Sequence, residues 1–183
     1  MSKLIMWNLL TLDGYFEGDK SWALDFHQIA WGDELKRLTI DQLHAAGTLI
    51  FGRVTYEGMA AYWQTAKGED ADLMNSLPKV VVSRTLDRAG WNNTKLVKEN
   101  AVQEISKLKQ QSSKDIFVFG SANLSATLMQ HNLFDEYRLC LVPVVLGKGK
   151  PLFAQGLSQR KLNLQDERRL KSGSILLYYV PEM

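Results

Sequence analysis

The segment from Lys114 to Phe153 constrains the fold of this chain more than any other stretch. It opens with Ile116–Phe119, a short apolar run of the kind that forms a strand buried on both faces. Gly120-Ser121-Ala122 follows and is small enough for a tight turn that a ligand can approach closely. Asn123 can cap a helix after this turn, and Tyr137 to Leu146 has the composition of a second strand. The segment therefore predicts a strand, a tight turn, a helix and a strand in succession.

A turn of this kind places a helix N-terminus directly after a strand. Free backbone N–H groups and the positive end of the helix dipole make such a turn suitable for a phosphate group. One glycine before a helix is more often an ordinary turn, but the arrangement occurs twice more upstream. Phe51-Gly52-Arg53-Val54-Thr55 and Val82-Ser83-Arg84-Thr85 each begin at the end of an apolar run. Because ligands of open α/β sheets bind beyond the carboxyl ends of the strands, the three turns are expected to meet in one crevice.

The residue types in these turns favour a ligand that carries several phosphates. Arg53 and Arg84 can each bind a phosphate through two parallel N–H bonds, and the neighbouring Ser and Thr hydroxyls add donors. NADPH is an extended molecule of this kind, and an Arg after a strand suits its 2′-phosphate. The alternative is that both arginines are ordinary surface residues. The G-x-G-x-x-G fingerprint of other dinucleotide sites is absent from the sequence.

Strands and helices alternate along the rest of the chain. The pattern predicts strands at 3–11, 48–51, 79–82 and 95–97, helices at 33–46 and 56–62, a helix after Asn100, and a hairpin of 162–170 with 175–180. Asp33 is the expected N-cap of the first helix, and Gln103 would complete a capping box with Asn100. The polar stretch 64–77 is expected to be a loop that can include one helical turn near Ala71 to Asn75. A mostly parallel central sheet with helices on both faces and an antiparallel C-terminal hairpin follows from this order.

The composition is that of one soluble globular domain covering residues 1–183. The chain is 45% hydrophobic and 23% charged, and it has a formal net charge of +2, too small to indicate nucleic-acid binding. No apolar run approaches the roughly 18 residues that cross a membrane. The single cysteine, Cys140, is expected to be buried rather than reactive. These features predict a cytoplasmic protein with a small-molecule ligand.

A substrate would lie between the first strand and the aromatic segment 16–32. Asp13, which follows that strand, and Trp22 are the candidates for facing the substrate, with Tyr56 behind them. The alternatives are that Asp13 only forms a turn with Gly14 and that Trp22 is a core residue. The aromatic segment itself is either a lid over a pocket or a cap on the core. The three histidines share no ligand spacing, so no metal site is predicted, and no catalytic residue is identified.

Six motifs are distributed over nearly the whole chain. They are TLDGY at 11–15, LIFGRVTYE at 49–57, VVVSRTL at 80–86, VFGS at 118–121, LFDE at 133–136 and PVVLGKGKPLF at 143–153, of which the last is specific. With these motifs the sequence resembles the dihydrofolate reductase-like superfamily, and most closely the reductase domain of bacterial riboflavin biosynthesis, which occurs alone or fused to a zinc deaminase.

This resemblance implies a dihydrofolate reductase-like three-layer fold that binds NADPH. It implies that Gly52, Arg53 and Thr55 bind the cofactor and that Ser83, Arg84 and Thr85 lie near its 2′-phosphate. The residues that would hold the pyrophosphate are Gly120, Ser121, Ala122, Asn123 and Leu124. Members of the family are commonly homodimers, sometimes paired through their C-terminal strands. No zinc deaminase signature is present, and one cysteine could not supply it.

The implied activity is NADPH-dependent reduction of a small heterocycle, such as 5-amino-6-(5-phosphoribosylamino)uracil in riboflavin synthesis. Two departures from the family keep alternatives open. Gly120-Ser121 stands where much of the family has two glycines, and the carboxylate of dihydrofolate reductases has no clear counterpart among Asp33, Glu34 and Asp41. A dihydrofolate reductase-like activity is one alternative. A dimeric nucleotide-binding module without turnover is another.

Overall fold

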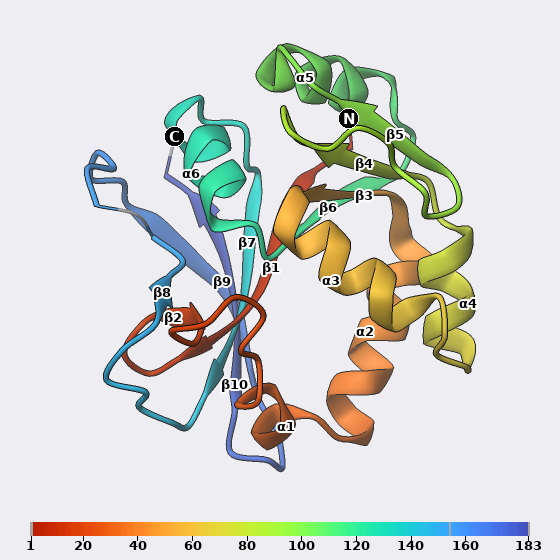
Figure 1. Ribbon diagram of the computed structural model, residues 1–183. Coiled ribbons are helices and arrows are strands. Elements are labelled where there is room, and N and C mark those ends of the chain that lie inside the picture. The colour runs from red at the N-terminus through yellow and green to blue at the C-terminus, as the bar shows by residue number, and fades with distance from the viewer. Residues whose placement is uncertain (1, 154, 183) are drawn as a thin grey trace.

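An eight-stranded sheet forms the centre of the molecule in the computed structural model, which describes residues 2–153 and 155–182 (Figure 1). Its strand order is β5-β4-β3-β6-β1-β7-β10-β9. The strands are β1 (Leu4–Thr11), β3 (Ala46–Gly52), β4 (Lys79–Val82), β5 (Thr94–Val97), β6 (Asp115–Phe119), β7 (Glu136–Val142), β9 (Leu162–Arg169) and β10 (Ile175–Pro181). All neighbouring strands from β5 to β7 pair in parallel, and β10 pairs antiparallel with both β7 and β9. The predicted α/β fold with an antiparallel C-terminal hairpin is confirmed.

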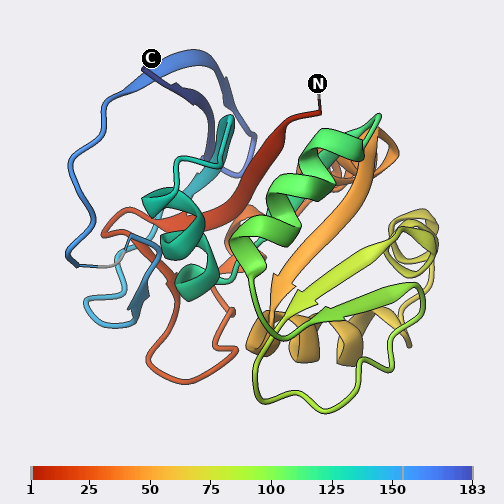
Figure 2. The same ribbon diagram turned by 90° about the horizontal axis from the view of Figure 1, so that it is seen from above.

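Helices cover both faces of this sheet, as the two views of the ribbon show (Figures 1 and 2). One face packs against α2 (Asp33–Ala45), α3 (Arg53–Trp63) and α4 (Glu69–Ser76). The other face packs against α5 (Ala101–Gln111) and α6 (Ala122–Gln130). Alternate residues of β1 divide between the two cores: Ile5, Trp7 and Leu9 point to the first face, and Leu4, Met6 and Leu10 to the second. The sheet is therefore the middle of three layers.

The central strands are long apolar runs because both of their faces are covered. All eight residues of β1 are buried, and so are the last four of β6. Parallel strands that are buried on both faces are typically near-continuous apolar runs in α/β proteins. The registers Leu4↔Ile116 and Trp7↔Phe119 align the two strands, and β1 continues for four residues beyond the last pair. β1 therefore extends past the end of β6, at the edge of the sheet where the three predicted turns were expected to meet.

The stretch 64–77 departs from the predicted loop because Glu69–Ser76 forms the helix α4. Glu69, Asp70 and Asp72 lie in its first turn, where negative charge is favourable beside the helix dipole. Ala71 and Met74 bury its inner side against the core. The helix is too short to show a repeated apolar spacing, so the sequence pattern predicted less helix than the structure contains.

Helix and strand ends also differ from the predicted ones. The N-cap of α6 is Ser121 rather than Asn123, and the N-cap of α2 is Gly32 rather than Asp33. Asn100 does precede α5, but its backbone is left-handed and its side chain makes no capping bond, so no capping box forms. β7 ends at Val142, directly before Pro143, instead of continuing to Leu146.

The aromatic segment 16–32 contains two short elements that the sequence did not predict. Tyr15–Glu17 is a strand, β2, that pairs antiparallel with β8 (Lys150–Pro151) in a separate two-stranded sheet. In the second half of the segment, the four residues His27–Ala30 form the single-turn helix α1. The pairing attaches the segment to the loop after β7, so both lie at the same end of the sheet.

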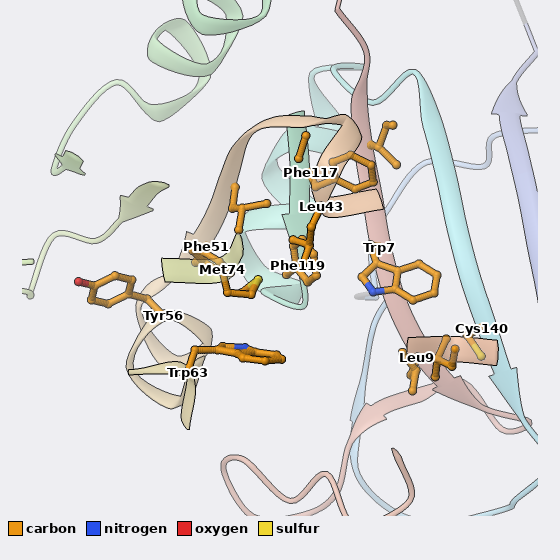
Figure 3. Close-up of a cluster of buried hydrophobic side chains, with 14 of the residues drawn as sticks. Trp7, Leu9, Leu43, Phe51, Tyr56, Trp63, Met74, Phe117, Phe119 and Cys140 are labelled. Carbon is orange, nitrogen blue, oxygen red and sulfur yellow. The ribbon is translucent and has the colours of Figure 1, made fainter. Parts of the chain in front are cut away.

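The buried cluster between the sheet and helices α2 to α4 contains the single thiol (Figure 3). Cys140 on β7 is fully buried, and burial raises the pKa of its thiol to about 12. Since the thiolate is the reactive species, we expect no reaction of the native protein with Ellman's reagent at pH 8. In urea the same thiol should react completely. Rapid labelling of the native protein would contradict the placement of Cys140.

Candidate active site

A cavity of about 1040 Å³ lies at the carboxyl edge of the parallel strands. Its lining comes from residues at the ends of β3, β4, β5 and β6, from the middle of β1, and from the aromatic segment and α3. Ligand pockets of enzymes typically measure about 300–1,000 Å³. The cavity is therefore large enough for a dinucleotide together with a small second molecule.

Three helix N-termini converge on one half of this cavity. The lining includes Gly52–Thr55 at the start of α3, Lys98–Ala101 at the start of α5 and Gly120–Leu124 at the start of α6. The first backbone N–H groups of a helix have no partner within the helix, and the helix dipole is positive there. This half of the cavity is therefore suited to the phosphates of an anionic ligand.

Hydrogen bonds tie the turn after β3 to the turn after β6. The Gly52 N–H donates to Ser121 Oγ at 2.8 Å, and the Ser121 N–H donates to Thr55 Oγ1 at 3.1 Å. Ser121 Oγ in turn donates to the Phe119 carbonyl at 2.8 Å. Gly120 and Ser121 both have left-handed backbones, which is uncommon for serine. The Ser121 hydroxyl thus has a donor and an acceptor within the protein, and these bonds fix the relative positions of the two turns.

Three cationic side chains lie on the same half. Arg53 donates to Glu57 Oε2 at 2.9 Å one helical turn away, and both side chains are largely exposed. Arg84, after β4, and Lys98, after β5, are exposed on the lining. The sequence analysis did not single out Lys98, although its place directly after a predicted strand is the same signal that indicated the two arginines.

Aromatic side chains form much of the other half. Trp7 from β1, Trp22 and Trp31 from the aromatic segment, and Tyr62 and Trp63 from α3 all line it. Trp31 and Tyr62 remain more than 40% exposed, so large aromatic surface stays open to a ligand. This half can therefore hold a planar ring by stacking and apolar contact.

Trp22 is held in an unusual backbone conformation. Its φ of 64° lies in the left-handed region, which is rare for an aromatic residue. The Trp22 N–H donates to the Glu17 carboxylate, and the indole lies against Gly58 so closely that a Cβ there would be 2.4 Å from the ring. The bare backbone of α3 at Gly58 and the Glu17 carboxylate together set the position of this tryptophan.

Glu17 is a buried carboxylate that sequence analysis missed. It is 5% exposed, lines the cavity, and its Oε2 lies 3.9 Å from the Lys150 ammonium, which also lines the cavity. Nothing in the local pattern distinguishes it, because its burial depends on the pairing of β2 with β8.

Two further polar groups on the lining have buried nitrogen atoms without hydrogen-bond partners among the described residues. One is Asn8 Nδ2 on β1, and the other is His27 Nε2 on α1. Burial lowers the pKa of the His27 imidazole to about 4, so the ring is neutral at neutral pH. Buried polar groups are normally paired, so these two nitrogens cost stability, and because they are not exposed they do not themselves face the cavity.

Most of the predicted cofactor residues are brought together here. Of the eleven, ten line the cavity, and Thr85 is the exception. The Ser83 hydroxyl accepts the backbone N–H groups of Thr85 and Leu86, so it shapes the turn after β4. Among the predicted substrate residues, Trp22 lines the cavity, whereas Asp13 and Tyr56 do not.

Asp13 and Tyr56 have structural partners instead. The Asp13 carboxylate accepts hydrogen bonds from Thr11 Oγ1 and from the backbone N–H groups of Gly147 and Leu146. These bonds, the one from Thr11 foremost, lower the pKa of the carboxyl group. It thereby joins the turn after β1 to the loop after β7. Tyr56 is 4% exposed, and its hydroxyl accepts the Trp91 N–H at 2.8 Å. Figure 3 shows Tyr56 and Trp63 extending from α3 in opposite directions.

The arrangement of the sheet, the two helical layers and the edge cavity defines a dihydrofolate reductase-like fold. A dihydrofolate reductase from Enterococcus faecalis complexed with NADP(H) aligns with 99% of this chain and 97% of its own at a TM-score of 0.66 and 14% identity. A candidate riboflavin biosynthesis protein from Shewanella sp. PV-4 aligns over 99% of both chains at a TM-score of 0.82 and 20% identity.

Sequence comparison specifies the family within this fold. Residues 2–177 match the RibD C-terminal domain, and the chain belongs to that family. YyaP, an uncharacterized protein of Bacillus subtilis, is 31% identical over 97% of this chain and 94% of its own length. The resemblance inferred from the motifs is thereby confirmed, and membership of this family supports a reductase-like role. Within the described residues, every helix is too short or too polar to cross a bilayer.

The bonds of Ser121 predict a stability cost for its replacement. Ser121→Ala leaves the Gly52 N–H and the Phe119 carbonyl without their partner, so we expect unfolding free energy to fall by about 1–3 kcal/mol. Thr127→Ala, on the exposed side of the same helix, is the matched control and should change stability little. Urea unfolding followed by tryptophan fluorescence measures both. Equal stability of the two variants would contradict the role of Ser121.

The neutral, partly buried His27 predicts a pH-dependent stability. Because its pKa is about 4 when folded and about 6.5 when unfolded, the unfolded chain takes up this proton first as the pH falls. The stability that His27 contributes is therefore complete above pH 6.5 and declines between pH 6.5 and 4. By linkage, about 2–3 kcal/mol should be lost between pH 7 and 4.5. Urea unfolding should show a shallower pH dependence for His27→Gln; an identical dependence would refute the burial effect.

Proposed function

We propose that this protein is an NADPH-dependent reductase of a small heterocyclic compound, acting on 5-amino-6-(5-phosphoribosylamino)uracil or a related ring. The observation that carries the proposal is the division of one cavity into two unlike halves. One half has three helix N-termini with Arg53, Arg84 and Lys98. The other half is largely aromatic. A dinucleotide and a planar substrate require these two environments side by side.

The residues fit the cofactor on this account. The starts of α3 and α6 would hold the pyrophosphate through backbone N–H groups of their first turns, since both turns line the cavity and the bonds of Ser121 hold them together. Arg84 and Lys98, at the ends of β4 and β5, would bind the 2′-phosphate. When bound, a reduced nicotinamide supplies a hydride to an electron-poor carbon.

The chain itself would contribute orientation and exclusion of water. Trp7, Trp22 and Trp63 provide apolar walls near β1, where the gap beyond β6 allows two ligands to meet. Glu17, buried beside Lys150, is a carboxylate on the lining that would face the substrate from β2. Phe26 belongs to the core, and Trp22 rests on Gly58, so neither fills the cavity. This openness favours an enzyme over a binding module without turnover.

The cofactor assignment is tested by binding. Trp7, Trp22, Trp31 and Trp63 line the cavity, so bound NADPH should accept energy from them and emit at longer wavelength. We expect NADPH to bind at least tenfold more tightly than NADH, and Arg84→Ala to remove most of that preference because it deletes a cation for the 2′-phosphate. Arg37→Ala, an exposed cation outside the cavity, is the control. If neither nucleotide binds, the cofactor assignment fails, and this chain shares only its fold with NADPH-binding reductases.

Turnover is tested next by the loss of NADPH absorbance with 5-amino-6-(5-phosphoribosylamino)uracil and with dihydrofolate in parallel. Reduction of the pyrimidine alone supports the proposal. Reduction of dihydrofolate would favour the folate alternative, and tight NADPH binding with neither activity would favour the binding module. The homodimer implied by the resemblance stays a prediction.

A further inference from the structure

We infer that Lys79 is a positioning residue for the cavity: its buried ammonium group holds α4 and Trp91 against α3, the helix that connects the two halves of the cavity. This helix starts in the turn Gly52–Thr55, in the half with the three helix N-termini, and ends at Trp63 in the aromatic half. The inference rests on the proposed function, because it concerns how the cofactor and a second ligand are placed relative to each other.

Lys79, the first residue of β4, is only 1% exposed. Its ammonium group donates to the backbone carbonyls of Met74 at 2.8 Å, Asn75 at 3.1 Å and Leu77 at 2.6 Å, so each of its three N–H groups has an acceptor. These carbonyls lie at the C-terminal end of α4, where the negative end of the helix dipole favours a cation. Burial lowers the pKa of the ammonium group to about 8, so the group is charged at pH 7.

The local sequence explains why α4 ends on this side chain. Pro78 has no N–H group to donate to the Met74 carbonyl four residues earlier. The next N–H group, that of Lys79 itself, donates to the Asn93 carbonyl at 2.8 Å, in the loop before β5. The Lys79 side chain thus supplies the hydrogen bonds that the backbone of residues 78 and 79 does not give to the helix.

The same ammonium group fixes the position of a buried indole. The ammonium nitrogen lies 4.6 Å from the centroid of the Trp91 ring, a distance at which the negative face of the ring attracts a cation. The Trp91 Nε1 donates to Asn75 Oδ1 at 2.7 Å, so the ring is held at its face and at its edge. Because Lys79 and Trp91 are both buried, solvent screens this attraction little. We call Lys79, Asn75 and Trp91 the buried network.

The buried network is attached to both ends of α3. The Trp91 backbone N–H donates to the Tyr56 hydroxyl at 2.8 Å near the start of the helix, and Asn75 Nδ2 donates to the carbonyl of its last residue, Trp63, at 2.8 Å. The Trp63 indole donates to the Met59 sulfur at 3.2 Å, so its orientation follows the helix. Met59 and Trp63 line the cavity, whereas the three members of the network lie outside the lining. The network therefore acts on the cavity through α3.

The position of α3 matters because reduction by a nicotinamide depends on short distances. The reacting atoms of two bound molecules must approach to about 3–3.5 Å. α3 contributes the turn Gly52–Thr55 to one half of the cavity and Met59 and Trp63 to the other, so its displacement changes the spacing of the two ligands. Without the Lys79 charge, we expect ligands that still bind but react slowly.

The position of α3 is measured first, in protein labelled with 5-fluorotryptophan. The sequence contains five tryptophans, and single Trp→Phe variants assign their fluorine-19 NMR resonances. Lys79→Met has a similar length but no charge. It should shift the Trp91 resonance through loss of the adjacent charge and the Trp63 resonance through movement of α3. Lys79→Arg keeps a cation and should return the Trp63 resonance toward its native position.

Phe134→Leu is the matched control for a loss of stability alone, because Phe134 is buried in the core on the other face of the sheet and outside the cavity. It should lower the unfolding midpoint without moving the Trp63 resonance. A native Trp63 resonance in Lys79→Met, or an equal shift in Phe134→Leu, would overturn the inference. If Lys79→Met does not fold, Trp91→Phe replaces it, since it keeps a ring beside the ammonium group and removes the bond to Asn75. A native Trp63 resonance in that variant would likewise overturn the inference.

Turnover then measures the functional consequence. In the NADPH oxidation assay, Lys79→Met should lower kcat about tenfold and change the KM for NADPH less than threefold, because Lys79 lies outside the lining. A kcat equal to that of the native chain would overturn the positioning role, whatever the KM. Failure of the native chain to bind NADPH would overturn the proposed function, while the fluorine resonances would still decide whether Lys79 positions α3.

Discussion

The parallel pairing of β3, β6 and β1 is the constraint on which the rest of this structure depends. Parallel strands end at the same edge of a sheet, and each is followed by a connection that begins there. The starts of α3 and α6 are therefore adjacent, although nearly seventy positions separate them in sequence. Because β6 ends before β1, the same pairing also leaves the gap in which two ligands could meet.

The adjacency of the turns is then refined by side chains. Ser121 occupies a left-handed position that glycine would adopt at lower cost, and it compensates with hydrogen bonds to both neighbouring segments. Thr55 provides the reciprocal bond. A residue that the motif comparison marked as a departure thus fixes the spacing of the two turns. Its effect on a ligand is indirect, through the backbone N–H groups that it positions.

The two halves of the cavity differ in how the protein defines them. The half proposed to bind phosphate combines backbone at three helix ends, which the fold itself provides, with the side chains of Arg53, Arg84 and Lys98. The aromatic half depends on individual side chains, among them the strained Trp22 and the unpaired His27. Strain and unpaired polar groups cost stability and concentrate at functional sites. We therefore propose that specificity resides in this half.

The sequence by itself determined the order of the eight strands of the central sheet and of helices α2, α3, α5 and α6, the mostly parallel pairing and the three turns. Apolar periodicity and small residues after strands are local signals. Only the tertiary structure decided that Glu17 is buried and that His27 Nε2 has no hydrogen-bond partner among the described residues. It also decided that Asp13 and Tyr56 bind the backbone of other segments instead of lining the cavity. These properties arise from contacts between segments far apart in the chain. A single sequence records which residues are present, but the packing of β2 on β8 and of α1 on the sheet decides which of them face the cavity.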